Sequence, residues 1–279
     1  MMRKKPMLAY PASDRPINYN EPVFIQPKLD GVRCLIQYAD GKVTAYSRTG
    51  KVWKNIEHIE LNLLKFFNKY PNVILDGELY NHDFRNDFES IISMVRKQKP
   101  TAKDKLKSSL HVQFHCYDIV NENMCFDDRA EFISSYVPES YCVHHVDTDF
   151  TPSDHHSKHI NGLHLIDGYE GSILRTNSVY QCKRSHSLRK LKNFQDAEAR
   201  IEGWVEGKGK RTGTVGKFLA IDASGIRFGM PVMANYKYLQ DNFKLMQGYV
   251  GKIATFTYFE RTKANSYRHP LFKCIRNYE

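Results

Sequence analysis

The sequence predicts an α+β protein in which a larger domain of antiparallel sheets flanked by helices precedes a small all-β barrel. Two patterns lead to this prediction. Over the first two thirds of the chain, runs that alternate as strands do are interspersed with apolar residues at helical spacing. Beyond about residue 194, short strand-like runs and glycine-containing loops predominate.

In the larger domain, the strand-like runs are bounded by turn residues such as the Asp40-Gly41 pair. We expect strands at residues 23–27, 33–38, 43–47, 73–80, 110–120, 141–146, 169–175 and 188–192. Apolar residues at helical spacing predict a helix over residues 55–70, which Pro71 ends. Further helices are expected at residues 84–96, 127–136 and 154–166, and loops at residues 1–20 and 97–109.

The last third of the chain has the pattern of a small barrel. Its predicted strands are residues 201–205, 213–221, 225–229 and 252–259, with a helix near residues 235–246. A barrel of about five strands, such as an OB-fold, suits this pattern. We therefore expect a first domain over residues 1–196 and an OB-fold domain over residues 197–279.

The composition indicates a globular protein with a basic surface. The 279 residues carry a formal net charge of +10, which suits a polyanionic partner such as nucleic acid or merely aids solubility. No apolar run is long enough to span a bilayer, and no apolar signal-peptide core follows the basic start. The six cysteines are scattered without a Cys-x-x-Cys pair, as is typical of reduced thiols. We expect a cytoplasmic protein.

Residues 28–33, which read Lys-Leu-Asp-Gly-Val-Arg, join two predicted strands. The tight Asp-Gly turn can hold the Lys28 amine at the edge of a sheet, where a substrate can meet it. A surface hairpin whose turn happens to follow a lysine is the plain structural alternative.

Five further short motifs follow this stretch in order along the chain. They are Ser47-Arg48-Thr49-Gly50, Asp76-Gly77-Glu78, Tyr117-Asp118, Glu170-Gly171 and Lys190-Leu191-Lys192. With the lysine stretch, the series resembles the motifs of the covalent nucleotidyltransferases, which include ATP-dependent DNA ligases, RNA ligases and mRNA capping enzymes. Within that family the chain resembles the minimal ATP-dependent DNA ligases of viruses and phages. The resemblance implies a nucleotidyltransferase domain with ATP-grasp-like antiparallel sheets and helices, followed by an OB-fold.

Lys28 is the expected catalytic residue, because a deprotonated lysine amine is a nucleophile toward phosphorus. Its attack on the α-phosphate of ATP would expel pyrophosphate and leave AMP on the lysine. Lys190 and Lys192 lie on one face of a strand, as residues i and i+2 do, so both can contact the α-phosphate. An exposed basic edge strand is the alternative interpretation of this pair.

The resemblance assigns Glu78 to the ribose and Glu170 to a metal site. Both carboxylates are hard oxygen donors suited to Mg²⁺ or Mn²⁺, so we expect both at the metal, and ordinary surface acids are the alternative. Because residues 73–80 are strongly apolar, an acid in that strand also needs a partner.

The resemblance also predicts the residues around the base. Tyr117 would stack on adenine, although the family often has Phe there and a core aromatic is the alternative. Gln26 is expected to bond the adenine amino group, and Leu29 is expected beside the nucleotide.

Several basic residues are expected to hold phosphate groups. Arg33 resembles the family arginine at the ribose, and Arg48 the arginine at the 5′-phosphate of a nick, because arginine binds phosphate through two parallel bonds. A flexible loop with Lys208, Lys210 and Arg211 would follow a phosphate backbone. Solvated surface side chains are the alternative for each.

Arg268 and Lys273 lie in a stretch that resembles the end of phage-type ligases, where basic residues orient pyrophosphate. The stretch departs from the stricter Arg-x-Asp-Lys pattern of other members. His155 and His159 have helical i, i+4 spacing, but no glutamate follows His155, so the zinc pattern His-Glu-x-x-His is not met.

The resemblance implies an ATP-dependent DNA ligase that seals nicks through a lysyl-AMP and a 5′-adenylated DNA intermediate. ATP and Mg²⁺ (or Mn²⁺) are the expected cofactors, and nicked double-stranded DNA is the expected partner. We expect a monomer in the cytoplasm (the host cytoplasm for a virus) that acts in DNA replication, repair or recombination. The alternatives are an mRNA capping guanylyltransferase, an RNA ligase and a DNA-binding protein with an inactive transferase domain.

Overall fold

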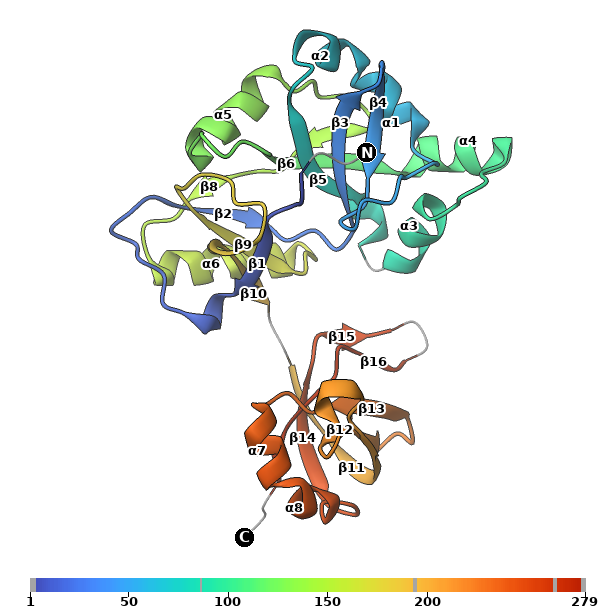
Figure 1. Ribbon diagram of the computed structural model, residues 1–279, viewed down its shortest axis with the longest axis vertical. Coiled ribbons are helices and arrows are strands. Elements are labelled where there is room, and N and C mark those ends of the chain that lie inside the picture. Colours follow the sequence, from blue (N-terminus) through green and yellow to red (C-terminus); the bar gives the residue numbers. More distant parts are fainter. Residues whose placement is uncertain (1–3, 86, 193–194, 263–264, 277–279) are drawn as a thin grey trace. The chain divides into compact units, whose positions relative to one another are not determined.

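The computed structural model describes residues 4–85, 87–192, 195–262 and 265–276 (Figure 1). The chain divides into two compact units, Met1–Lys192 and Asn193–Glu279. The expected α+β architecture is confirmed, with mixed sheets and helices in the first unit and a small, mainly β second unit. The division after residue 192 falls four residues before the predicted end of the first domain at residue 196.

Sheet A of the first unit carries the lysine stretch at the end of one strand. In spatial order it contains β1 (Leu8–Pro11), β10 (Arg184–Lys192), β9 (Gly171–Thr176), β2 (Val23–Pro27) and β8 (Asp149–Phe150). All neighbours are antiparallel except β1, which runs parallel to β10. A Cβ atom at Gly171 would lie 2.2 Å from the carbonyl oxygen of Leu191, and its φ of +133° also favours glycine, so this position holds β9 close to β10.

Sheet B of the first unit carries the acidic motifs. In spatial order it contains β4 (Lys42–Tyr46), β3 (Val32–Ala39), β5 (Ile74–Tyr80), β6 (Gln113–Ile119) and β7 (Val143–His145). Successive side chains of a strand point to opposite faces. Leu75, Leu79 and Cys116 belong to the apolar core on one face, so Glu78 and Tyr117 point to the other face. The alternation therefore separates a packed face from a chemical face.

Helices cover the packed face of sheet B and one side of sheet A (Figure 1). The helices are α1 (Glu57–Asn62), α2 (Leu64–Lys69), α3 (Phe88–Val95), α4 (Ala102–His111), α5 (Phe126–Tyr136) and α6 (Asp154–Ile166), with 3₁₀ turns η1 (Ala12–Asp14) and η2 (His82–Phe84). Residues of α1, α2, α3 and α5 join the core of sheet B. On sheet A, Ile160 of α6 packs against Ile25 and Leu174.

The second unit is built on one antiparallel sheet. In spatial order it contains β13 (Arg227–Pro231), β12 (Val215–Ile221), β11 (Gln195–Glu206), β14 (Ile253–Tyr258) and β17 (Leu271–Ile275). The outer strands β13 and β17 contact each other, as expected for a barrel. Helices α7 (Tyr236–Asp241) and α8 (Phe243–Gln247) lie between β13 and β14, and β15 (Glu260–Arg261) pairs with β16 (Tyr267–Arg268). The predicted helix near residues 235–246 is thus two short helices.

Three local predictions in the first unit were wrong. The predicted loop at residues 97–109 contains α4, whose start is fixed by a capping box between Thr101 and Asp104. The first twenty residues contain β1, which is held by its partner β10 and has no strong strand pattern of its own. The helix expected over residues 55–70 is interrupted at Leu63, where α1 ends and α2 begins. The helix predicted at residues 154–166 is confirmed as α6.

The partly buried imidazole of His115 gives the first unit an expected sensitivity to acid. The His115 ring lies 5.0 Å from that of His144 and 5.3 Å from that of Tyr80. Burial, and then the neighbouring His144 and His82, lower the pKa of His115 to about 3. The ordinary value is 6.5, so the stability that neutral His115 contributes is present above pH 6.5 and is lost as the pH falls toward 3.

We expect the wild-type protein to lose about 2 kcal/mol of unfolding free energy from this group between pH 7 and pH 5. A His115→Gln variant does not titrate there, so its melting temperature should fall less between these two pH values. The measurement is thermal unfolding of both proteins at each pH. An equal fall in both would contradict the role given to His115.

Candidate active site

The lysine stretch crosses from sheet A to sheet B. The backbone of Lys28 continues the pairing of β2, because its N–H donates to Gly171 O at 2.9 Å and its carbonyl accepts from Glu170 N–H at 3.1 Å. A Cβ atom at Gly31 would lie 2.4 Å from Leu79 O and 2.7 Å from Glu78 Cγ. Only glycine therefore allows the turn to pass this close to β5.

A cavity of about 150 Å³ lies beside this turn, between the chemical face of sheet B and sheet A. It is lined by seven residues predicted to hold a nucleotide: Gln26, Lys28, Leu29, Arg33, Glu78, Tyr117 and Lys190. Ile173, Arg175 and Leu188 are among the residues that complete the wall. The structure thus brings together side chains that are up to 164 residues apart in the chain, from Gln26 to Lys190. We call this the nucleotide cavity.

Lys28 and Lys192 both form ion pairs with the buried carboxylate of Glu170, beside the nucleotide cavity. Lys28 Nζ pairs with Glu170 Oε2, and Lys192 Nζ pairs with Glu170 Oε1. Burial by itself raises the pKa of Glu170, but Lys28 and then Lys192 outweigh this effect and hold the pKa below its ordinary value. Glu170 is therefore a carboxylate that fixes the Lys28 amine at the mouth of the turn.

Lys190 lines the same cavity from β10. Burial, followed by the positive charges of Lys192 and Lys28, lowers its pKa. Lys28, Lys190 and Lys192 thus converge beside Glu170, and a bound phosphate group would relieve the mutual repulsion of their ammonium groups. This arrangement is suited to a polyphosphate.

Glu78 and Tyr117 form a hydrogen-bonded pair on the chemical face of sheet B. The Tyr117 hydroxyl donates to Glu78 Oε2 at 3.3 Å. Burial raises the pKa of Glu78 to about 7, although Arg33 and Lys28 act in the opposite direction. Burial also raises the pKa of Tyr117 well above its usual range, so the phenol remains a donor.

Arg33 lines the nucleotide cavity, and Asp76 holds its guanidinium group in place. Its Nε donates to Asp76 Oδ1 at 2.6 Å, its Nη2 pairs with Asp76 Oδ2, and the Tyr180 hydroxyl also donates to Asp76 at 2.7 Å. The guanidinium carbon lies 5.1 Å from the centre of the Tyr117 ring. These contacts leave Arg33 little freedom and fix its guanidinium group beside Asp76 and the Tyr117 ring.

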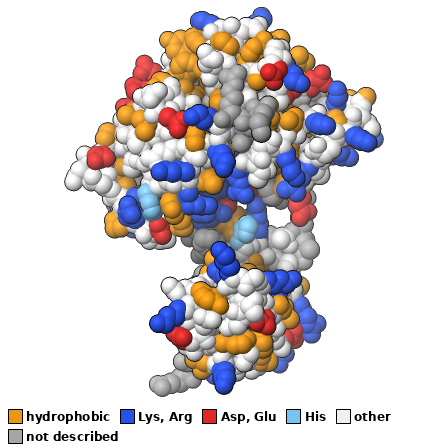
Figure 2. Space-filling view, viewed as in Figure 1, with side chains coloured by type: hydrophobic (Ala, Val, Ile, Leu, Met, Phe, Trp, Pro, Cys, Tyr) orange, Lys and Arg blue, Asp and Glu red, His pale blue; other side chains and the backbone are white. Residues whose placement is uncertain are grey.

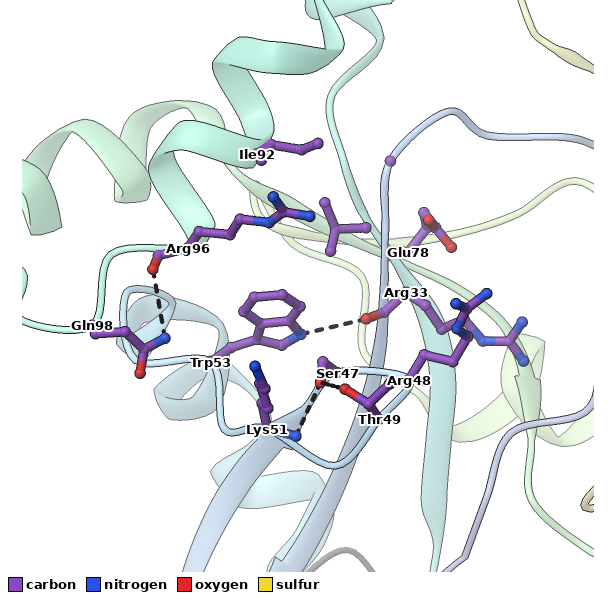
Figure 3. A pocket seen from close by; sticks show the side chains of 12 residues that line it. Arg33, Ser47, Arg48, Thr49, Lys51, Trp53, Glu78, Ile92, Arg96 and Gln98 are labelled. Carbon is purple, nitrogen blue, oxygen red and sulfur yellow. Dashed lines mark hydrogen bonds between the residues drawn. The ribbon is translucent and has the colours of Figure 1, made fainter. Parts of the chain in front are cut away.

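A second and larger cavity of about 1060 Å³ adjoins the first through Arg33 and Glu78, which line both (Figure 3). Arg48 lines it from the turn after β4, together with Ser47, Thr49 and Lys51. Arg96 and Gln98 line it from the end of α3 and the segment that follows, as Figure 3 shows. We call it the basic cavity.

Glu78 and Glu170 are the two residues predicted to bind Mg²⁺. Among the described residues, no group of three His, Cys, Asp or Glu side chains is arranged to hold a metal ion. Mg²⁺ at phosphoryl-transfer sites is typically bound by one or two carboxylates and the substrate phosphates. Glu78 and Glu170 supply two carboxylates of the required kind, and both lie close enough to Lys28 for its charge to act on them.

The remaining predicted residues lie in the second unit. Lys208 and Lys210 are exposed at the turn η3 (Gly209–Arg211), and Arg211 donates to Val232 O at 3.3 Å. Lys273 pairs with Asp196 at 2.6 Å, and the Arg268 guanidinium carbon lies 5.7 Å from the Phe259 ring centre. The Lys208 loop thus presents free charge, whereas Lys273 is held by an acid.

Comparison with known proteins agrees with this geometry. The family model described as "ATP dependent DNA ligase domain" matches residues 6–192. The chain belongs to the ATP-dependent DNA ligase family. A second family model, described as a DNA ligase OB-like domain, matches residues 206–276 of this ligase-family chain, so the expected OB-fold is confirmed.

Curated DNA ligases resemble the chain at moderate identity. A DNA ligase of African swine fever virus is 28% identical over an alignment of 202 residues, and the match covers 68% of this chain and 46% of the viral protein. This ligase-family chain therefore spans about half the length of that relative. A DNA ligase of Haemophilus influenzae is 26% identical over 215 residues, which are 75% of this chain and 71% of the relative.

The solved structure from a study of Lig E DNA ligases, titled as DNA binding with a minimal scaffold, shares the fold. It matches with a TM-score of 0.78 at 24% identity, over 99% of this chain and 100% of the other. Across the described residues of the ligase-family chain, we find no helix long and apolar enough to cross a membrane.

Sequence reasoning missed several residues that line the two cavities. Arg175 lines the nucleotide cavity, and Lys51, Trp53 and Arg96 line the basic cavity. One signal for Arg175 was present, because an arginine that ends an apolar strand must find a buried partner. For Arg96, which lies in no motif of the ligase family, the sequence offered no such signal.

Proposed function

We propose that this protein seals nicks in duplex DNA with ATP, through a lysyl-AMP intermediate on Lys28 and a 5′-adenylated DNA intermediate. One observation supports this proposal most strongly. Motif residues from both sheets surround one small cavity at Lys28, and the basic cavity with Arg48 opens directly beside it. The nucleotide would thus bind in the nucleotide cavity, and the phosphate that receives its AMP would bind in the adjoining basic cavity.

In the first step, Lys28 releases a proton to solvent, leaves Glu170 and attacks the α-phosphate of ATP as a neutral amine. A P–N bond forms, the bond to the β-phosphate oxygen breaks, and pyrophosphate departs. Glu170 keeps its contact with Lys192 while Lys28 moves, so the carboxylate is never left unpaired. Lys190 and Lys192 stabilise the charge that develops on the phosphate oxygens.

A divalent cation held by Glu78 and Glu170 would supply further neutralisation of the phosphate charge. Arg33 and the Glu78–Tyr117 pair are placed to hold the ribose and the base, since all three line the nucleotide cavity. Their own bonds to Asp76 and to each other fix them before the nucleotide arrives.

In the second step, an oxygen of the nick 5′-phosphate attacks the AMP phosphorus and Lys28 departs. In the third, the 3′-hydroxyl attacks the 5′-phosphate, a phosphodiester forms, and AMP departs. Within the described chain, no carboxylate pairs with the charged groups of Arg48, Lys51 or Arg96, which all line the basic cavity. These free cations suit DNA phosphates, and lysine and arginine side chains are spread over the visible face of the first unit (Figure 2).

The second unit has supporting roles in this proposal. The exposed Lys208 and Lys210, with Arg211, would contact the DNA backbone. Arg268 and Lys273 would orient pyrophosphate, and Lys273 would first have to leave Asp196. We further propose that the protein is a cytoplasmic monomer with two domains, residues 1–196 and 197–279. All six cysteines are free thiols, which suits a reducing compartment.

The test is nick sealing by the purified protein on a labelled duplex. ATP with Mg²⁺ should join a nick that carries a 5′-phosphate, and a nick with a 5′-hydroxyl should remain open. Joining that depends on GTP, or joining of RNA ends with no activity on nicked DNA, would favour the capping enzyme or the RNA ligase and contradict the proposal.

Arg48→Ala should spare adenylation of Lys28 and slow nick sealing by about 100-fold. An arginine that binds the nick 5′-phosphate through paired bonds acts only once DNA is present. The measurement compares the rate of lysyl-AMP formation with the rate of sealing in the same preparation. Nick affinity should also depend less steeply on salt than in the wild type, because one phosphate contact has been removed.

Lys103→Ala is the matched control, since Lys103 is an exposed cation of α4 that lines neither cavity. It should leave sealing almost unchanged. Equal losses of adenylation and sealing in Arg48→Ala, or equal affinity for nicks with and without the 5′-phosphate, would contradict the role given to Arg48.

A further inference from the structure

The side chain of Gln26 is tied into the protein at both ends of its amide. Its Oε1 accepts from Arg175 Nε at 2.7 Å. Its Nε2 donates to Thr148 Oγ1 at 2.8 Å and to the carbonyl oxygen of Tyr117 at 3.2 Å. Gln26 is also almost completely buried, with 2% of its surface exposed, so these contacts are not exchanged with water.

These partners allow only one orientation of the amide. A guanidinium group only donates, so Arg175 must face the amide oxygen, and a carbonyl only accepts, so Tyr117 O must face the amide nitrogen. The Thr148 hydroxyl donates its own proton to Val146 O at 3.2 Å, which leaves its oxygen to accept from Gln26. Both amide hydrogens are therefore consumed, and only a lone pair on Oε1 remains for a ligand.

We place this lone pair of Gln26 Oε1 at the wall of the nucleotide cavity. Gln26 and Arg175 line it together with Lys28 and Tyr117, and in sheet A the Cα atom of Gln26 is paired with that of Ile173, which lines it too. A purine that stacks on Tyr117 would present its edge to these residues. A 6-amino group donates to an acceptor there, whereas a 6-oxo group would place two unshared oxygen lone pairs against each other.

Arg175 is itself held rigidly. Its Nη1 donates to Asp118 Oδ2 at 2.5 Å, and its guanidinium carbon lies 4.7 Å from the Phe126 ring centre. Asp118 is fixed in turn by Arg129, whose Nε donates to Oδ1 at 2.7 Å. A buried chain of charged groups thus reaches from α5 to the amide of Gln26, and it keeps the amide oxygen in place when the cavity is empty.

We propose that Arg175 and Thr148 are positioning residues that set the choice of purine, because they fix Gln26 as an acceptor that admits 6-aminopurine and rejects 6-oxopurine nucleotides. The inference rests on the proposed function, since it concerns the nucleotide that adenylates Lys28. It deepens that function by naming the part of the site that separates ATP from GTP, the nucleotide of the capping alternative.

The experiment measures the rate of covalent nucleotide transfer to the full-length protein from ATP and from ITP, which differ at the 6-position and at the adjacent N1. Thr148→Val removes one acceptor of the amide nitrogen, and Thr148 does not line the nucleotide cavity. Arg175→Met removes the donor to the amide oxygen. Each single variant keeps at least one partner that fixes the amide, so the Thr148→Val/Arg175→Met double variant gives the decisive comparison. With only Tyr117 O left, the amide can turn its nitrogen toward a 6-oxo group, and the ATP-to-ITP rate ratio should fall by about tenfold.

Conservative variants separate positioning from a purely structural role. Thr148→Ser keeps the hydroxyl, and Arg175→Lys keeps a group that only donates, so both should retain the wild-type ratio. If the Thr148→Val/Arg175→Met double variant slows both nucleotides equally and leaves the ratio unchanged, the inference is overturned. Absence of wild-type labelling by ATP would instead contradict the proposed function, and it is seen before any variant is compared.

Discussion

Lys28→Ala should form no covalent adduct with AMP. The amine is held at the end of β2 by two backbone hydrogen bonds and by Glu170, and it lines the nucleotide cavity. Lys190 lines the same cavity and its pKa is lowered, which makes it the strongest rival nucleophile. The measurement is transfer of label from α-labelled ATP to the denatured protein, with detection limits that reveal a loss of about 10⁴-fold.

Lys190→Ala is the matched control for this result. Removing a cation that only stabilises the phosphate should slow adduct formation by about 100-fold and leave it detectable. The Lys28→Ala protein should still seal a nick that has already been adenylated, because the last step does not use the amine. Undiminished labelling of Lys28→Ala, or labelling that disappears only in Lys190→Ala, would show that the nucleophile has been misassigned.

Glu170→Ala should reduce adenylation and sealing by roughly 100-fold or more while the protein remains folded. The carboxylate is the shared partner of Lys28 and Lys192, and its removal takes away a negative charge that offsets the repulsion among Lys28, Lys190 and Lys192. The Lys28 amine would lose its fixed position, and the site would lose a ligand for the metal ion. The measurement is the rate of each step over a Mg²⁺ series.

Glu122→Ala provides the comparison for this variant. Glu122 also pairs with a lysine, Lys4, but this pair is exposed to solvent and neither residue lines either cavity. Exposed pairs contribute little to stability, so this variant should react at the wild-type rate. Wild-type sealing by Glu170→Ala at low Mg²⁺ would rule out the metal role, and a collapse of its melting temperature would show that the loss is structural.

The sequence was most informative where the chemistry depends on a short motif. Lys28, Arg33, Glu78 and Tyr117 were predicted as neighbours, and the structure places them around one cavity. The apolar character of residues 73–80 also predicted correctly that an acid in this strand needs a partner. That partner is the Tyr117 hydroxyl, which the motif pattern did not identify.

The contacts that the sequence did not reveal depend on tertiary pairing. Arg175 meets Gln26, 149 residues away, only because β9 pairs with β2 in one particular register. Gln26 was expected to read adenine, but the number of bonds that its amide already makes within the protein was not readable from the chain. Strand β1 was missed for the same reason, since its four residues are ordered by β10 and not by their own pattern.

The most direct test of nick sealing through a lysyl-AMP intermediate follows the label from ATP through the reaction. Wild-type protein is first incubated with α-labelled ATP and Mg²⁺, freed of unbound nucleotide, and then mixed with a nicked duplex. Label should appear first on Lys28, then at the 5′-phosphate of the nick, and finally as free AMP when the strand is sealed. Label that comes from GTP alone, or that stays on the protein after the nick is added, would contradict the assignment of nick sealing with ATP.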